Sequence, residues 1–190
     1  MTAFDGSPQS SAHAVATPFS ILLGAAIGRG HTELSAFDDA LHRVGVGDVN
    51  LVRLSSVVPP QAQVEVVVDG SVAPAGTTWG DRLYCVYAAQ VASSPGEQAW
   101  AGIGWMRGDA GPKVGGLFVE HEAADEATVH RLITTSLDDM ARRRAQEFAP
   151  ATRHVIGASC ERPGEAVCAL VIAAYAASGW HDGELRRTDR

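Results

Sequence analysis

The sequence predicts an α+β fold in which strands outnumber helices and pair mainly in antiparallel fashion. Only two segments have helical periodicity, whereas roughly seven or eight short apolar runs are typical of strands. Several of these runs are joined by short turn sequences rather than by helices, which argues against a doubly wound parallel sheet. A chain of 190 residues is long enough for one domain with a sizeable core and short for two.

The first predicted elements are a strand and a helix. Residues 18–24 form an apolar run that predicts a buried strand, and residues 25–31, with their glycines, predict a loop. From residue 32 the apolar residues fall on one helical face, which predicts a helix between an N-cap at Thr32 and a stop at Gly45. The members of that face are Leu34, Phe37, Leu41 and Val44.

The middle of the chain is rich in strands. A turn signal at residues 93–96 predicts that the runs on either side of it form a hairpin. The run that begins at residue 49 ends at two consecutive prolines, which cannot continue a strand. The predicted strands are residues 49–58, 64–68, 83–92, 99–106 and 117–121.

The last part of the chain predicts a helix followed by a second hairpin. The helix has an apolar face that runs from Val129 to Phe148. The hairpin joins residues 153–160 to residues 166–175 through a turn at 162–164. Residues 1–15 and residues 181–190 are polar. We expect residues 1–15 to be disordered and residues 181–190 to form a loose tail.

Composition excludes several classes of partner and site. The 15 basic and 22 acidic residues give a net charge of −7, which argues against nucleic acid and anionic membranes as partners. The three cysteines lack the spacing of a zinc site, so we expect no metal and a reducing, cytoplasmic location. No apolar run is long enough to span a bilayer, and no signal peptide is evident.

Most familiar catalytic motifs are missing from the sequence. The glycines at 24, 28 and 30 lack the GK[ST] and GxGxxG patterns of phosphate-binding loops, and no GxSxG elbow supports a serine hydrolase. Lys113 is the only lysine and lies among glycine, proline and alanine, which makes it a poor candidate for the internal lysine of a pyridoxal phosphate enzyme.

The informative pair is Ser55–Ser56, which lies inside an apolar strand run and precedes Val-Val-Pro-Pro. Strands that cross a core normally carry β-branched or aromatic residues, and two buried hydroxyls need hydrogen-bond partners. On this pattern alone two interpretations are open. Either both serine hydroxyls have hydrogen-bond partners near a strand end and serve only the structure, or the pair is a reactive site.

Four segments resemble the pyruvoyl-dependent arginine decarboxylase family. That family has a TxLNAFDxAL helix, matched by residues 32–41, and a GxGNxNLxxxSSxxPP segment, matched by residues 45–60. Residues 94–97 resemble its hairpin turn, and residues 116–122 resemble its GLIMEYE strand. The resemblance implies one domain over residues 16–180, an αββα-type sandwich with mostly antiparallel sheets and helices outside. It also implies a homotrimer, or a multiple of it, with sites between neighbouring subunits.

The resemblance implies self-cleavage between Ser55 and Ser56 into a β chain, 1–55, and an α chain, 56–190. The Ser56 hydroxyl would attack the Ser55 carbonyl to give an ester, and β-elimination followed by hydrolysis would leave a pyruvoyl group on residue 56. Asn50 resembles the family asparagine tied to this region, and its alternative role is that of a strand-edge amide. The covalent pyruvoyl group, derived from Ser56, would replace pyridoxal phosphate as the electron sink.

The resemblance implies decarboxylation of an amino acid, L-arginine to agmatine and CO₂. Glu120 would protonate the α-carbon, although without the resemblance it reads as an exposed acid at a strand end. Asp38, Leu41 and Ser55 would contact the substrate, with the Asp38 carboxylate on the guanidinium.

Three departures from the family pattern leave the substrate open, because they lie near the implied site. Ser35 and Asp48 replace asparagines, and Arg29 is a cation that would either repel arginine or hold a substrate carboxylate. The alternatives are the same chemistry on another amino acid, and an uncut homologue that acts as a binding or assembly protein.

Overall fold

The computed structural model describes residues 19–109, 114–144, 146–181 and 184–189. The predicted disordered segment 1–15 and Lys113 lie outside these residues. The elements are β1 (Phe19–Gly30), α1 (Glu33–Arg43), β2 (Asn50–Arg53), β3 (Val57–Val58), β4 (Gln63–Val66), β5 (Arg82–Ala92), β6 (Gln98–Arg107), β7 (Gly116–Ala123), α2 (Glu126–Arg142), β8 (Thr152–Ser159), β9 (Ala166–Ser178), β10 (Leu185–Arg186) and β11 (Thr188–Asp189).

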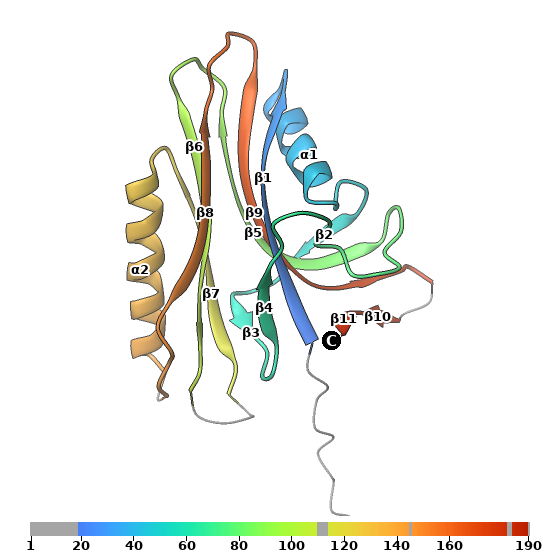
Figure 1. The fold of residues 1–190 in the computed structure, drawn as a ribbon, viewed down its shortest axis with the longest axis vertical. Coiled ribbons are helices and arrows are strands. Elements are labelled where there is room, and N and C mark those ends of the chain that lie inside the picture. Colours follow the sequence, from blue (N-terminus) through green and yellow to red (C-terminus); the bar gives the residue numbers. More distant parts are fainter. Residues whose placement is uncertain (1–18, 110–113, 145, 182–183, 190) are drawn as a thin grey trace, which may run out of the picture.

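Two sheets face each other, and one helix covers the outer face of each (Figure 1). The large sheet has the order β11-β1-β9-β5-β2, with β10 paired to β9 and β4 paired to β1. The small sheet has the order β3-β7-β6-β8. Only β1–β4 and β2–β5 pair in parallel among the described strands, so the predicted α+β sandwich with mostly antiparallel sheets and outer helices is confirmed.

Strand β9 forms the middle of the molecule. All 13 of its residues are buried, and successive side chains enter different cores. Val171 packs between the two sheets, whereas its neighbour Leu170 packs under α1. A strand buried on both faces favours apolar residues at nearly every position, and this explains the almost unbroken apolar run over residues 166–177.

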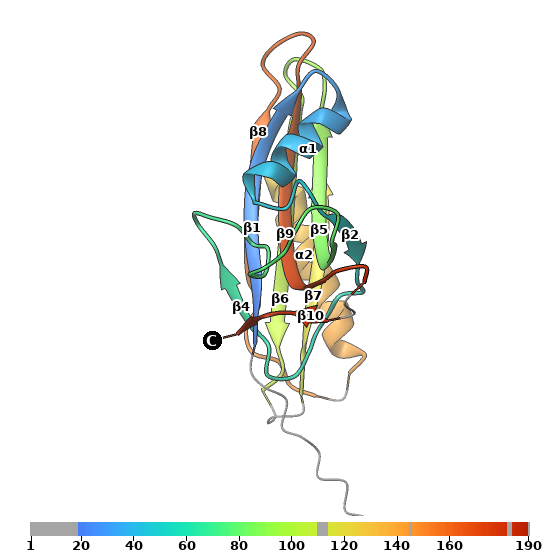
Figure 2. The ribbon, with the colours of Figure 1, turned by 90° about the vertical axis from the view of Figure 1, so that its right-hand side faces the viewer.

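Helix α1 lies across β1, β9 and β5 (Figure 2). The predicted start is confirmed, because the Thr32 side chain accepts a hydrogen bond from the Ser35 backbone N–H at 3.1 Å. The predicted loop at 25–31 is wrong, since β1 continues to Gly30. Gly28 lies so close to α1 that a Cβ atom there would come 2.1 Å from the Ala36 carbonyl oxygen, so this glycine permits close packing within a strand. The predicted helical face is wrong at Leu34, which is 76% exposed.

Both predicted hairpins are wrong. Strand β5 belongs to the large sheet and β6 to the small sheet, and the turn between them carries the chain from one layer to the other. The connection from β8 to β9 does the same in the opposite direction. The predicted single strand at 49–58 is likewise divided into β2 in the large sheet and β3 in the small sheet.

The second helix and the tail also differ from expectation. Helix α2 ends at Arg142, and Phe148 instead lies in a bridge with Gly108. In the predicted loose tail, β10 and β11 pair with β9 and β1, so the described part of residues 181–190 is tied to the large sheet. Neither described helix combines the length and apolar character needed to cross a membrane.

Candidate active site

The bond between Ser55 and Ser56 lies where the chain passes from one sheet to the other. On the large-sheet side, the Leu54 backbone N–H donates to the Cys85 carbonyl at 2.9 Å. On the small-sheet side, the Phe118 N–H donates to the Ser56 carbonyl at 3.1 Å. The two serines are therefore held from both ends, while Ser55 itself is exposed to solvent.

Ser56 and Glu120 meet in space. The Ser56 hydroxyl lies 3.2 Å from Oε1 and 3.0 Å from Oε2 of Glu120 and donates to this carboxylate. Glu120 belongs to β7, two residues beyond the Phe118 amide that holds Ser56. The expected association of these two site residues is thus present in the structure.

Burial raises the pKa of the Glu120 carboxyl above its ordinary value. The hydrogen bond from Ser56 and the positive charge of Arg53 act against this rise, whereas the charge of Glu122 adds to it. A carboxyl with a raised pKa keeps its proton at higher pH, which suits a group that must donate a proton.

The Ser55 carbonyl, the acceptor in the implied attack, has a hydrogen-bond donor of its own. The Val57 backbone N–H lies 2.7 Å from the Ser55 oxygen, across a tight turn centred on Ser56. Attack on this carbonyl would place negative charge on that oxygen, and a fixed N–H stabilises such charge. The local backbone therefore has the geometry of a one-donor oxyanion site.

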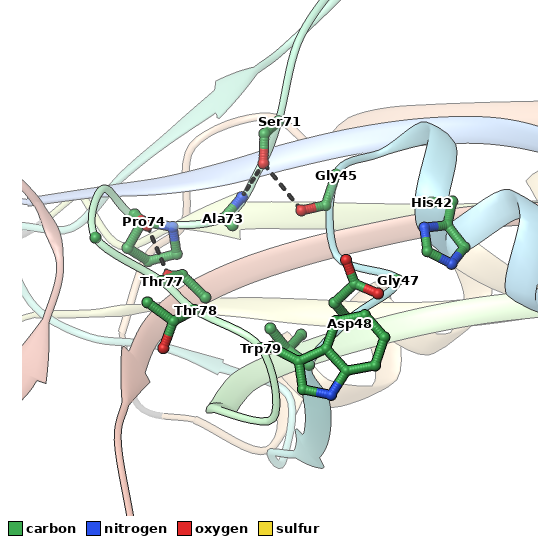
Figure 3. Close-up of a pocket in the computed structure, with 12 residues that line it drawn as sticks. His42, Gly45, Gly47, Asp48, Ser71, Ala73, Pro74, Thr77, Thr78 and Trp79 are labelled. Carbon is green, nitrogen blue, oxygen red and sulfur yellow. Dashed lines mark hydrogen bonds between the residues drawn. The ribbon is translucent and has the colours of Figure 1, made fainter.

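Asp38 lies apart from the serines, on the exposed face of α1. It lines a surface pocket together with His42, Asp48, Asn50 and Trp79, and we call this pocket the Asp38 groove. The Asp38 carboxylate is 3.6 Å from His42 Nε2. An adjoining pocket shares His42, Asp48 and Trp79 with the groove, and Figure 3 shows these three side chains toward one side of it. Neither pocket is lined by Ser55, Ser56 or Glu120.

Asn50 and Leu41 each contact other parts of the same chain. The Asn50 side chain donates to the Gly80 carbonyl at 2.7 Å, so in this structure it is a strand-edge amide at the start of β2. Leu41 is 8% exposed and packs in the core between α1 and the large sheet.

The three departures from the family pattern occupy different places. Arg29 pairs with Glu165 at 3.0 Å at the end of β1. Ser35 completes the capping box of α1. Asp48 lines the Asp38 groove.

Two residues near the serines were missed at the sequence level. The Tyr175 hydroxyl donates to the Val57 carbonyl at 3.1 Å, and the Arg53 guanidinium lies 4.8 Å from the centre of the Tyr87 ring. Tyr175 carries the one polar side chain among residues 166–177, apart from a cysteine, and that contrast was the available signal. The sequence contained no comparable signal for Arg53, because an arginine at the end of a strand is common.

The described residues contain no group of three or more histidine, cysteine, aspartate or glutamate side chains placed to hold a metal ion. The three cysteines are buried and free. Burial raises the pKa of the Cys85 thiol to about 12 and that of Cys168 to about 11, so neither forms a thiolate readily.

A four-layer sandwich with a carboxyl held against a Ser-Ser bond fits the class of pyruvoyl-dependent decarboxylases. The family model described as pyruvoyl-dependent arginine decarboxylase (PvlArgDC) matches residues 20–179, and the chain belongs to this family.

Similar proteins carry the same family name. A pyruvoyl-dependent arginine decarboxylase of Thermococcus sibiricus is 33% identical over 164 residues, which cover 84% of this chain and 98% of that protein. One from Halobacterium salinarum is 38% identical over 150 residues, 76% of this chain and 86% of that protein. A solved structure of a pyruvoyl-dependent histidine decarboxylase covers 75% of this chain and 61% of its own, at 13% identity and a TM-score of 0.41.

Proposed function

We propose that the chain cleaves itself between Ser55 and Ser56 and then decarboxylates L-arginine to agmatine and CO₂. The observation that carries the proposal is the hydrogen bond from the Ser56 hydroxyl to Glu120, formed beside a Ser-Ser bond that is held between two sheets. Membership of the family and the names of the archaeal relatives support arginine as the substrate.

Self-cleavage begins at the Ser56 hydroxyl. Its oxygen bonds to the Ser55 carbonyl carbon, the bond from that carbon to the Ser56 nitrogen breaks, and the hydroxyl proton ends on the freed nitrogen. The product is an ester between Ser55 and the Ser56 side chain. The hydrogen bond to Glu120 orients the attacking oxygen, and the Val57 N–H stabilises the charge on the Ser55 oxygen.

Elimination then separates the two chains. The Ser56 α-proton and the ester oxygen leave, which frees Ser55 as the carboxyl end of the β chain, 1–55. The dehydroalanine left on the α chain, 56–190, takes up water and loses ammonia, so the group at residue 56 becomes a pyruvoyl. When present, that group supplies a carbonyl that absorbs the electrons released as CO₂ departs. The proposed enzyme needs neither pyridoxal phosphate nor a metal.

Glu120 is the proposed proton donor to the α-carbon of the substrate. It already contacts the side chain from which the pyruvoyl group would form, so it would face the reacting atoms afterwards. Loss of the Ser56 oxygen also removes a hydrogen bond that lowers the pKa of Glu120. Cleavage would therefore raise the pKa of Glu120 further, so that a larger share of it carries the proton that it has to donate.

The Asp38 groove is the proposed site for the guanidinium of the substrate. Its carboxylates, Asp38 and Asp48, match a cation, and an indole face such as that of Trp79 attracts guanidinium groups. The Asp38 groove is not lined by Ser56, and in the proposed assembly the groove of one subunit would face the Ser56 of its neighbour. The proposed assembly is a homotrimer, or a multiple of it, in the cytoplasm, and each protomer has one domain over residues 16–180.

Product analysis on purified protein tests this function. The protein is incubated with a panel of amino acids, and CO₂ and amine products are measured. We expect agmatine from arginine and no comparable product from acidic or small amino acids. Release of CO₂ from another amino acid alone would overturn the substrate, and absence of any release from a fully cleaved protein would overturn the activity.

A further inference from the structure

Tyr175 is a buried tyrosine in contact with the segment that the proposed cleavage would divide. Its side chain lies in the core between the two sheets and is 6% exposed. The ring packs edge-on against Phe118, with centroids 6.0 Å apart and planes at 67°. The hydroxyl donates to the Val57 carbonyl at 3.1 Å.

The chemistry of Tyr175 suits a fixed donor rather than a proton carrier. Burial raises the pKa of its hydroxyl, and the nearby charge of Glu120 raises it further. The hydroxyl therefore stays protonated across the physiological range and can hold one carbonyl continuously. The neighbouring positions of β9 are alanines, so no other side chain at this point of the strand could do the same.

Three successive carbonyls of the reactive segment have fixed donors. The Ser55 oxygen accepts from Val57 N–H at 2.7 Å, and the Ser56 oxygen accepts from Phe118 N–H at 3.1 Å. The Val57 oxygen accepts from Tyr175. The bond to the Ser56 oxygen holds the peptide plane that carries the Val57 N–H, and the bond from Tyr175 holds the next plane, on the other side of the Val57 Cα.

From this arrangement we infer that Tyr175 is a positioning residue for self-cleavage. By holding the Val57 carbonyl, it keeps the Val57 N–H directed at the Ser55 oxygen while negative charge develops there. The effect belongs to the first step, in which the Ser55 carbonyl carbon passes from the Ser56 nitrogen to the Ser56 oxygen. This inference rests on the proposed function, because it assumes that the chain cleaves itself.

The test is the rate of cleavage in Tyr175→Phe, which removes the hydroxyl and keeps the ring. Full-length chain is made by cell-free synthesis, and the uncut fraction is followed over time by intact mass spectrometry. Tyr84→Phe is the matched control. Tyr84 lines the same small pocket as Tyr175, and its hydroxyl lies 3.3 Å from the Ser178 hydroxyl instead of the reactive segment.

We expect the half-time of cleavage to lengthen about 3- to 10-fold in Tyr175→Phe, the worth of one neutral hydrogen bond, and to stay unchanged in Tyr84→Phe. Hydroxylamine cuts the ester as soon as it forms, so the slowing should persist in its presence if the first step is affected. The same substitution in an uncut Ser56→Ala background should leave the unfolding temperature within a few degrees, which separates positioning from loss of fold.

Two outcomes would overturn the inference about Tyr175, and a third would overturn the proposed function itself. Cleavage of Tyr175→Phe at the wild-type rate contradicts a positioning role. Slowing that hydroxylamine abolishes assigns the effect to elimination and contradicts the step named here. Failure of the wild-type chain itself to cleave overturns the proposed function instead, and the two failures are thereby distinguished.

Discussion

The Ser56 hydroxyl lies 3.0 Å from Oε2 of Glu120, although 64 positions separate the two residues in the sequence. The contact exists because β3 and β7 are neighbours in the small sheet, and the Phe118 amide holds Ser56 beside that pair of strands. One carboxyl thereby serves two proposed stages. It orients the nucleophile of the uncut chain, and after cleavage it lies beside the position where the substrate would react.

Glu120→Gln should still cleave itself but turn over slowly. Glutamine can accept the same hydrogen bond from Ser56, yet it cannot deliver a proton to the α-carbon. We expect turnover of the cleaved variant to fall by about 10²- to 10⁴-fold, the usual contribution of a positioned general acid. Turnover is measured as CO₂ release per pyruvoyl-bearing chain.

Glu122→Gln is the matched control for this experiment, because Glu122 lies on the same strand and is exposed. It should retain nearly full turnover. If Glu120→Gln were as active as wild type while Glu122→Gln lost activity, the proton donor would have to be reassigned.

The burial of Glu120 also predicts a pH dependence of stability in the uncut Ser56→Ala chain. Because burial raises the folded pKa of Glu120 above its ordinary 4.5, the folded chain binds more protons than the unfolded chain between those two values. This residue's contribution to the free energy of unfolding is therefore full below pH 4.5 and is lost as pH rises through the folded pKa. Adding Glu120→Gln should raise the unfolding temperature at pH 8 and leave it nearly unchanged at pH 4. An equal change at both pH values would show that the effect is not ionisation.

Asp38→Asn should weaken the use of arginine without affecting cleavage. The change removes a charge but keeps the shape, and loss of one charge-assisted pair in a site closed by the proposed neighbouring subunit costs about 2–4 kcal/mol in kcat/KM. Glu33→Gln is the control, since it removes the same charge from α1 at a position outside the Asp38 groove. Full activity on arginine in Asp38→Asn would remove this residue from the substrate site.

Gly28→Ala should disturb the packing of α1 on the large sheet. A Cβ atom at this position would lie 2.1 Å from the Ala36 carbonyl oxygen and 2.8 Å from the Ala40 Cβ, so the helix must move away. Such overpacking costs about 1–3 kcal/mol, which chemical denaturation measures directly. Unchanged stability would show that the helix can shift without loss.

The fold class and the start of α1 could be predicted from the sequence, because their signals are local, whereas the cleavage at Ser55–Ser56 stays a prediction. The capping residue Thr32 and the Ser-Ser-Val-Val-Pro-Pro string depend on neighbours in the chain. The glycines of β1 misled the prediction, since a glycine required by a packed helix looks the same in sequence as one required by a loop.

The assignment of strands to sheets could not be predicted in the same way. A turn at residues 93–96 shows that the chain reverses, but not whether the next strand pairs with the last one or joins the facing sheet. That choice depends on packing between layers, here on the burial of β9 by the small sheet on one face and by α1 on the other. For the same reason Tyr175, which reaches the reactive segment from β9, carried only a weak signal.

The most direct test of the account is the intact mass of the purified protein under denaturing conditions. We predict two chains, residues 1–55 and a pyruvoyl-started chain over residues 56–190. Ser56→Ala should give a single uncut chain because no hydroxyl remains to attack, and Ser55→Ala should cleave with a milder defect because residue 55 supplies only its carbonyl. A folded wild-type protein that remains one chain of 190 residues after prolonged incubation would contradict the account.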